Sequence, residues 1–187
     1  KDLAETTNLS INNSIRKDFK VPGSKANLQI FREELELQSQ NFILHYLLAV
    51  LNSSVARYFL NRNRRSQLGF YPDDIKKLPV KITSRENQLA IKQLTLYITS
   101  CTGEENISAF HFFDKLIDSA VYQVYFPESF TNADIEVLKY VSAFPSFNDD
   151  STAEEKTEQA VKLYNQILQS SHEIINMIDK VEKLNEV

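Results

Sequence analysis

The sequence predicts an α+β fold in which a small mixed domain precedes a helical region. Apolar and polar residues alternate over short stretches of residues 1–40, which is the period of a strand. From residue 41 onward, apolar residues recur every three or four positions, which is the period of a helix. Only three glycines and five prolines occur among 187 residues, so there is room for long helices. We therefore expect a mixed domain over residues 1–85, a helical region over 86–148 and a long C-terminal helix over 149–187.

The mixed domain is expected to contain two or three short strands and one buried helix. Val21-Pro22-Gly23-Ser24 is a turn signal between the strands. Residues 41–60 predict a helix that is buried within the domain, because its first half is apolar on every face. Residues 61–71 predict a loop. A short helical turn should then begin at Pro72, because proline and acidic residues both favour the first turn of a helix.

Three amphipathic helices are expected between residues 84 and 144. The first can be capped by Ser84 or by Thr83, and it should end near Gly103. The second covers residues 106–126. The third covers residues 131–144, and a proline follows both of them.

A single long helix is expected from about residue 152 to residue 184. Ser151 and Glu154 match a capping box at its start. The residues of one seam are spaced three and four apart, as in a coiled coil, and all of them except Ser171 are apolar. These residues are Val161, Tyr164, Leu168, Ser171, Ile175 and Ile178. Two readings stay open, because this seam can pack inside the chain as a helical hairpin or mediate self-association.

Charge is distributed unevenly along the chain, although the net charge is only −4. Residues 1–56 are neutral, with six basic and six acidic side chains. Residues 57–85 carry eight basic and two acidic side chains, a net charge of +6. Residues 86–187 carry seven basic and seventeen acidic side chains, a net charge of −10. A basic segment therefore precedes an acidic remainder, and local patches of this kind govern electrostatic association.

The residues indicate no catalytic centre within this chain. The single cysteine, Cys101, excludes an internal disulfide and a cysteine-based zinc site. The three histidines fall in three different predicted helices, without a partner pattern around them. No signal peptide pattern is present, and the most apolar stretch is about half the length of a membrane span. We expect a cytoplasmic protein that has no membrane partner.

Residues 61–67 combine basic and amide side chains directly after the predicted buried helix. Arginine recognises guanine through two hydrogen bonds, and asparagine and glutamine recognise adenine in the same way. All of these side chains also reach phosphates. The loop is chemically suited to DNA, and the alternative is a solvated helix terminus whose cations favour the helix dipole.

The order of motifs between residues 27 and 126 resembles a known family. The segments are YLLAVLNSSVARYFLNRN, LGFYPDDIKKLPV and NQLAIKQL, followed by IDSAVYQVY. This order resembles the TaqI-like C-terminal specificity domain of restriction-modification enzymes and phage-defence DNA methyltransferases. It is similar, more weakly, to the specificity subunits of type I restriction systems. The methyltransferase tetrapeptide and the cofactor-binding glycines of the parent enzymes do not occur in this sequence.

The resemblance implies that the chain is the DNA-reading part of a larger type IIG-like restriction-modification enzyme or a related adenine-type DNA methyltransferase. The double-stranded DNA partner would then be read here, and S-adenosylmethionine and magnesium would bind only to catalytic domains outside this chain. A helical interaction or oligomerisation module is the alternative function. The residues expected to contact DNA are Asn61, Arg62, Asn63, Arg64, Arg65 and Gln67 in the loop, Lys76 and Lys77 at phosphates, and Arg57. Arg57 could instead pair with an acid of the protein.

Overall fold

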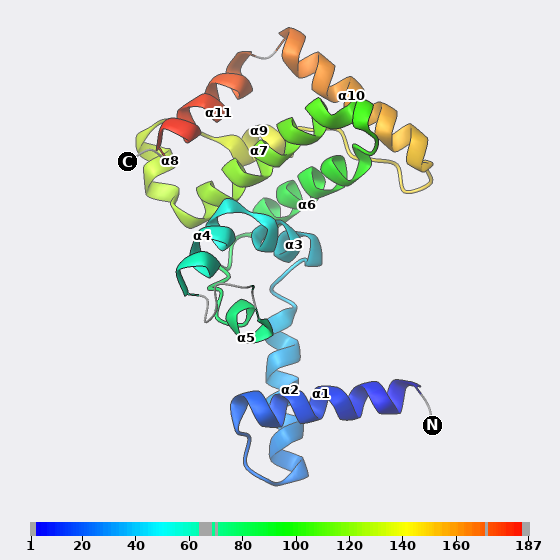
Figure 1. Ribbon diagram of the computed structural model, residues 1–187, viewed down its shortest axis with the longest axis vertical. Helices are drawn as coiled ribbons and strands as arrows, with labels where there is room; N and C mark the ends of the chain where they lie inside the picture. Colours follow the sequence, from blue (N-terminus) through cyan, green and yellow to red (C-terminus); the bar gives the residue numbers. More distant parts are fainter. Residues whose placement is uncertain (1–2, 64–68, 70, 171, 185–187) are drawn as a thin grey trace. The chain divides into compact units, whose positions relative to one another are not determined.

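The computed structural model describes residues 3–63, 69, 71–170 and 172–184. Within these residues, eleven α-helices and one 3-10 turn are the regular elements, and there is no strand (Figure 1). The predicted α+β class is therefore wrong, and the fold is all-helical. The chain divides into two compact units, Lys1–Phe42 and Ile43–Val187.

The first unit consists of two helices where strands were predicted. They are α1 (Leu3–Phe19) and α2 (Lys25–Ser39). Short apolar runs in this region fit both periods, since Ile11, Ile15 and Phe19 are also spaced as one helix face. The predicted turn at residues 21–24 is present, but it joins helices. Ser24 caps α2, because its Oγ accepts a hydrogen bond from the backbone N–H of Asn27 at 3.0 Å.

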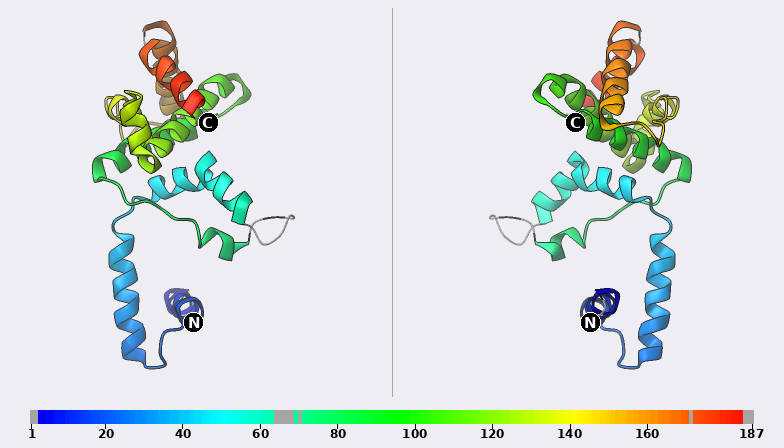
Figure 2. Two further views of the ribbon diagram at one scale, coloured as in Figure 1. Left: turned by 90° about the vertical axis from the view of Figure 1, so that its left-hand side faces the viewer. Right: turned by 90° about the vertical axis from the view of Figure 1, so that its right-hand side faces the viewer.

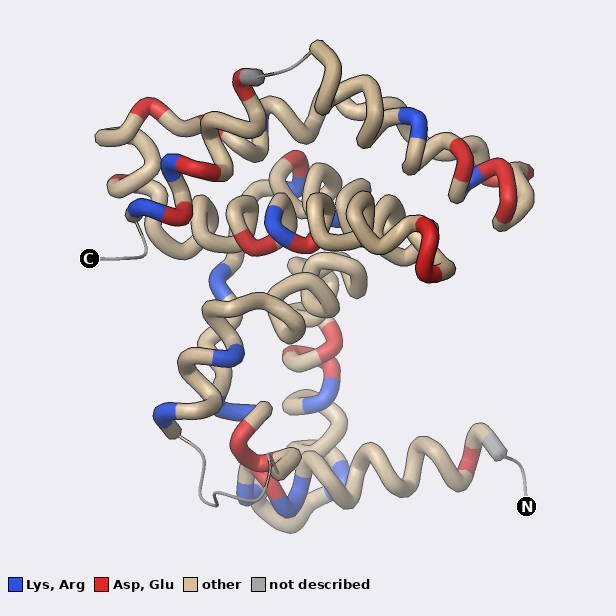
Figure 3. The backbone as a smooth tube through the Cα atoms, turned by 45° about the horizontal axis from the view of Figure 1, so that its top comes forward, with Lys and Arg blue, Asp and Glu red and all other residues tan. Residues whose placement is uncertain are grey.

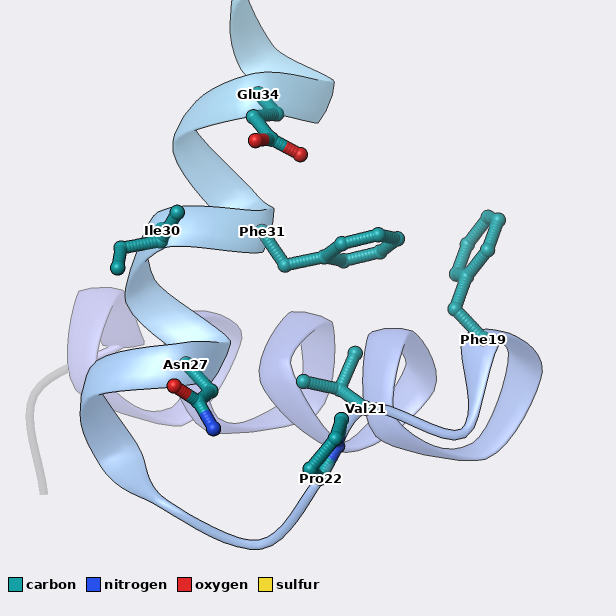
Figure 4. A pocket seen from close by; sticks show the side chains of 7 residues that line it. All are labelled: Phe19, Val21, Pro22, Asn27, Ile30, Phe31 and Glu34. Atoms are coloured by element: carbon teal, nitrogen blue, oxygen red, sulfur yellow. The ribbon is translucent and has the colours of Figure 1, made fainter.

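The core of the first unit is small. Ile15 and Leu28 are its buried apolar side chains among the described residues, and the rings of Phe19 and Phe31 lie 5.3 Å apart. Arg32 of α2 donates hydrogen bonds to two asparagine side chains of α1, at 3.0 and 3.1 Å. An open pocket of about 290 Å³ lies beside the two phenylalanine rings, with Glu34 among its lining residues (Figure 4).

The second unit begins with two short helices where residues 41–60 predicted one. These are α3 (Leu44–Asn52) and α4 (Ser54–Asn63). Ser53 lies between them, and its Oγ donates to the carbonyl of Val50 at 2.7 Å and accepts from the N–H of Ala56 at 3.3 Å. The side chain thus satisfies backbone groups at the break between the helices.

Helix α3 is buried on one side only, which corrects the prediction of a fully buried helix. Tyr46, Ala49 and Val50 are buried. Leu44 is 77% exposed, and the other exposed leucines, Leu48 and Leu51, continue the same face at intervals of four and three. Although α3 is apolar on every face, only one of its faces is buried.

The next helices begin near the predicted signals. Helix α5 (Pro72–Ile75) starts at the proline, and α6 (Arg85–Ser100) is capped by Ser84, whose Oγ accepts from the N–H of Asn87 at 3.2 Å. A 3-10 turn (Glu104–Asn106) leads into α7 (Ile107–Tyr125). Residues 131–144 do not form the single predicted helix. Instead, α8 (Pro127–Asn132) and α9 (Val137–Ser142) are separated by Asp134, which has a positive φ of 54°.

The C-terminal region contains two helices, α10 (Ala153–Ser170) and α11 (His172–Leu184), in place of one long helix. The capping box is formed by Thr152 and Glu155, one residue after the predicted pair. The buried side chains also lie mostly one position before the predicted seam. They are Ala160, Ile167, Ile174, Ile178 and Val181. Helix α10 contacts α6 and α7, and α11 contacts α7 and α9, so these side chains pack within the chain.

The second unit is layered around α6 and α7. Helices α10 and α11 cover one side of this pair, and α3 and α4 lie on the other side (Figures 1 and 2). Tyr97, Leu94 and Phe113 are fully buried, and the rings of Tyr97 and Phe113 stack at 5.1 Å. No helix of the described ranges has the length and apolarity that a bilayer crossing requires.

Candidate nucleic-acid interface

The described residues among those predicted to contact DNA come from two neighbouring parts of the second unit. Arg57, Asn61, Arg62 and Asn63 belong to α4, and Lys76 and Lys77 follow α5 directly. Arg64, Arg65 and Gln67 lie outside the described residues. Helices α4 and α5 contact each other, so the structure brings the described members of the set to adjoining elements.

The last turn of α4 carries three of the predicted residues. All three side chains, those of Asn61, Arg62 and Asn63, are exposed. They are helical, which corrects the prediction that the loop begins at residue 61. Arg62 makes no ion pair with a described residue, and its Nη1 donates to the hydroxyl of Tyr58 at 3.4 Å. A cation at this end of a helix is stabilised by the helix dipole and stays available to an external anion.

Helix α5 fixes the backbone immediately before Lys76 and Lys77, the two lysines predicted to contact phosphates. The carboxylate of Asp74 accepts a hydrogen bond from the backbone N–H of Tyr71 at 3.1 Å, and Asp74 is buried. Lys76 and Lys77 are exposed after this anchored turn. The Nζ of Lys76 lies 3.7 Å from a carboxylate oxygen of Asp73, and Lys77 forms no ion pair with a described residue. Lys77 is thus the less neutralised of the two cations.

Arg57 interacts with the acidic face of α7. The pKa of Asp114 is raised above its ordinary value, first by burial and then by repulsion from Asp118. The positive charge of Arg57 acts in the opposite direction and lowers that pKa, as does His111. The charge of Arg57 therefore favours a carboxylate of its own protein, although Arg57 forms no ion pair with a described acid.

Asp118 of α7 holds the beginning of α4. One carboxylate oxygen accepts from the backbone N–H of Ser54 at 2.8 Å, and the other accepts from the Ser54 hydroxyl at 2.5 Å. The first N–H group of a helix has no partner within the helix, so an acidic side chain here caps it and favours its positive end. This positioning residue lies 64 positions from its partner, and no local pattern signals it.

Tyr58 is the second residue that the sequence reasoning did not assign to the interface. Its side chain is 66% exposed, although it belongs to the segment 41–60 that the sequence predicts as a buried helix. It precedes Arg62 by one helical turn. Tyrosine hydroxyls and rings contact phosphates and sugars of DNA. The spacing of an aromatic residue four positions before an arginine is the signal that could have identified it.

The distribution of charge separates this region from the rest of the unit. Arginines and lysines mark α4 and the segment after α5, and acidic residues mark the 3-10 turn and the first turn of α10 (Figure 3). Within the described ranges, no group of three or more His, Cys, Asp or Glu side chains is placed to hold a metal ion. No protein-family model, curated protein or solved structure matches this chain.

Proposed function

We propose that this chain recognises DNA sequence as the target-recognition segment of a restriction-modification enzyme or a related phage-defence DNA methyltransferase, in the cytoplasm. The observation that carries the proposal is the exposed end of α4. There, an arginine without an ion pair to a described residue is flanked by two exposed asparagines. This end adjoins α5, after which two exposed lysines follow.

In this proposal, the two kinds of contact come from different residues. Arg62 and Lys77 bind phosphates, because both present charged groups outward without an acidic partner among the described residues. Asn61 and the side chains that follow α4 supply hydrogen bonds to base edges. The capping carboxylate of Asp118 fixes the axis of α4, and a fixed helix limits the number of ways in which its end can dock. The C-terminal end of α4 thus contacts the bases, and its N-terminal end is fixed by Asp118.

The proposal is tested by titrating a labelled random-sequence duplex with the protein at several salt concentrations. Binding should weaken steeply as salt rises, because each phosphate contact releases counterions. Arg62→Ala should weaken binding and reduce the slope of log K against log salt by about one. Lys162→Ala is the matched control, because Lys162 is exposed on α10 and lies outside the basic segment.

Two results would contradict the proposal. One is an absence of binding at about 50 mM salt, where the non-specific phosphate contacts are strong. The other is an equal effect of Arg62→Ala and Lys162→Ala, since the general charge of the surface would then explain the binding. If binding follows the prediction, a selection from a random library identifies the preferred site.

A second candidate function, self-association, is favoured by the exposed face of α3. Leu44, Leu48 and Leu51 form a stripe on a helix that carries no charged residue. Two copies can therefore meet on this face without like-charge repulsion. Sedimentation analysis should then show a dimer that Leu48→Glu dissociates. A monomer at all concentrations excludes this candidate and leaves the DNA proposal intact.

A further inference from the structure

A cleft of about 910 Å³ lies in the second unit, apart from the proposed DNA-binding residues. Its lining comes from α6, the end of α9, residues 144–149 and the first turn of α10. None of the predicted DNA contacts lines it. The volume lies within the range of small-molecule pockets, about 300–1,000 Å³, and it also accommodates several side chains of a peptide.

One face of α6 forms the floor of this cleft. Arg85, Leu89, Lys92 and Leu96 are spaced by four, three and four residues, and they share that face. The opposite face is buried in the core through Ile91 and its neighbours. From Arg85 to Leu96 the helix rises about 16 Å. The cleft therefore suits an elongated ligand that extends over three helical turns.

The walls of the cleft are held in place by hydrogen bonds. Gln93 and Tyr97 of α6 both donate to the carbonyl of Pro145, at 2.7 and 2.6 Å. The Thr157 hydroxyl of α10 donates to the carbonyl of Ser100 at 2.8 Å. Because the segment after α9 and the start of α10 are both tied down, the cleft is formed before a ligand arrives. Preorganisation of this kind reduces the entropy that binding would cost.

The three cations of the cleft have no acidic partner among the described residues, although two acids, Glu86 and Asp149, also line the cleft. Arg85, Lys92 and Lys156 form no ion pair with a described residue, whereas Lys115 and Lys139 of the second unit pair with glutamates at 2.7 Å. Leu89 is 49% exposed between the first two cations. An apolar floor with cations along its length is complementary to a segment that carries both leucine-like and acidic side chains.

We propose that this cleft binds an acidic amphipathic segment of a partner protein. Its apolar side chains cover Leu89 and Leu96, and its carboxylates reach Lys92 and Lys156. Glu86 and Asp149 also line the cleft. The carboxylates of Glu86 and Asp149 repel the continuous negative charge of a nucleic acid. They can instead pair with the few basic groups that an acidic peptide also carries.

The test uses the full chain and a fluorescein-labelled amphipathic peptide of about four helical turns, with leucines on one face and glutamates beside them. Fluorescence anisotropy should show saturable binding that weakens as salt rises. Lys92→Glu and Lys156→Glu should each weaken it about tenfold, because each reverses a charge beside the ligand. Leu89→Gln should weaken binding without a change in charge. Lys162→Glu is the matched control, because it reverses a lysine of α10 outside the cleft.

Three results would overturn the proposal. The first is no binding of the peptide by the wild-type protein, and the second is equal weakening by Lys162→Glu. The third is more effective displacement of the peptide by oligo-dT than by unlabelled peptide, which would make the cleft a nucleic-acid site. Circular dichroism of each variant checks that the fold is intact. Arg62→Ala should leave peptide binding unchanged, so a failure here and a failure of the DNA proposal are distinguishable.

Discussion

At the scale of single residues, two aspartates of α7 have opposite effects although they lie one helical turn apart. Asp118 satisfies the start of α4, whereas Asp114 is an acid whose ionisation is opposed by burial and by Asp118 itself. Arg57 and His111 offset this opposition only in part, because the pKa of Asp114 stays raised. Aspartate therefore stabilises the fold at position 118 and destabilises it at position 114, one helical turn earlier.

We expect Asp118→Asn to destabilise the protein. The substitution keeps the shape of the side chain but removes the negative charge at the helix start and replaces one acceptor oxygen by a donor. Loss of a helix cap costs about 0.5–2 kcal/mol in the free energy of unfolding. Urea denaturation monitored by circular dichroism measures this loss. An unchanged midpoint in the Asp114→Asn background, where the repulsion between the two carboxylates is absent, would mean that the contact with Ser54 contributes nothing to stability.

Asp114→Asn is the matched variant, and we expect it to stabilise the protein at pH 7. The folded state holds the Asp114 proton more tightly than the unfolded chain, because its pKa is raised above the ordinary 3.8. This contribution to stability is complete below the unfolded pKa and is lost as pH rises through the folded pKa. The advantage of the variant over the wild type should therefore disappear near pH 3. A stabilisation that is equal at both pH values would contradict this assignment.

At the scale of elements, helix ends follow local chemistry and helix breaks do not. Ser84 and Pro72 each mark a helix start in both the sequence and the structure, whereas Pro127, which the sequence predicts as a helix end, also begins α8. The break at Ser53 depends on a side chain that bonds to nearby backbone groups, a pattern that serines inside continuous helices also show. Boundaries were therefore predictable where a cap or proline was present, and breaks within apolar stretches were not.

Gly103 offers a test of one such boundary. Its φ is +91°, and a Cβ built there would lie 2.3 Å from a carboxylate oxygen of Glu105. We expect Gly103→Ala to lower the free energy of unfolding by about 1–3 kcal/mol, because L-residues are strained in this conformation. Gly23→Ala is the control, since no atom lies within 4 Å of the added Cβ. Equal thermal stability of the two variants would show that the loop after α6 tolerates side chains.

At the scale of the whole molecule, the two units differ in how much they bury. Among the described residues, Ile15 and Leu28 are the buried apolar side chains of the first unit, whereas the second contains a continuous core around Tyr97 and Phe113. Two helices with so small a core have little to offset the entropy of folding. The second unit therefore contains the interactions that keep this protein folded.

This difference predicts the behaviour of the separated units. A protein of residues 43–187 should unfold cooperatively in urea, and a peptide of residues 1–42 should show weak helical circular dichroism at 222 nm. Isolated helices of this length are marginal in water. A fragment 43–187 that loses cooperative unfolding would instead mean that the first unit contributes to its core.

The candidate sites show the same division between local and distant information. The charges of Arg62, Lys76 and Lys77 can be read from the sequence, and their side chains are exposed in the structure. The role of Asp118 was not, since its partner lies 64 positions away. The cleft along α6 was not predictable either, because its walls come from α9 and α10, which are distant in sequence from its floor.

The sequence by itself determined the Ser84 cap of α6, the helix start at Pro72, and the separation of a basic segment from an acidic remainder. These features depend on neighbouring residues, whose chemistry can be read directly. Only the tertiary structure decided that residues 3–19 and 25–39 are helical, that the C-terminal helices pack within the chain, and that Asp118 caps α4. Short apolar runs satisfy more than one period, and which face is buried depends on the elements that pack against it.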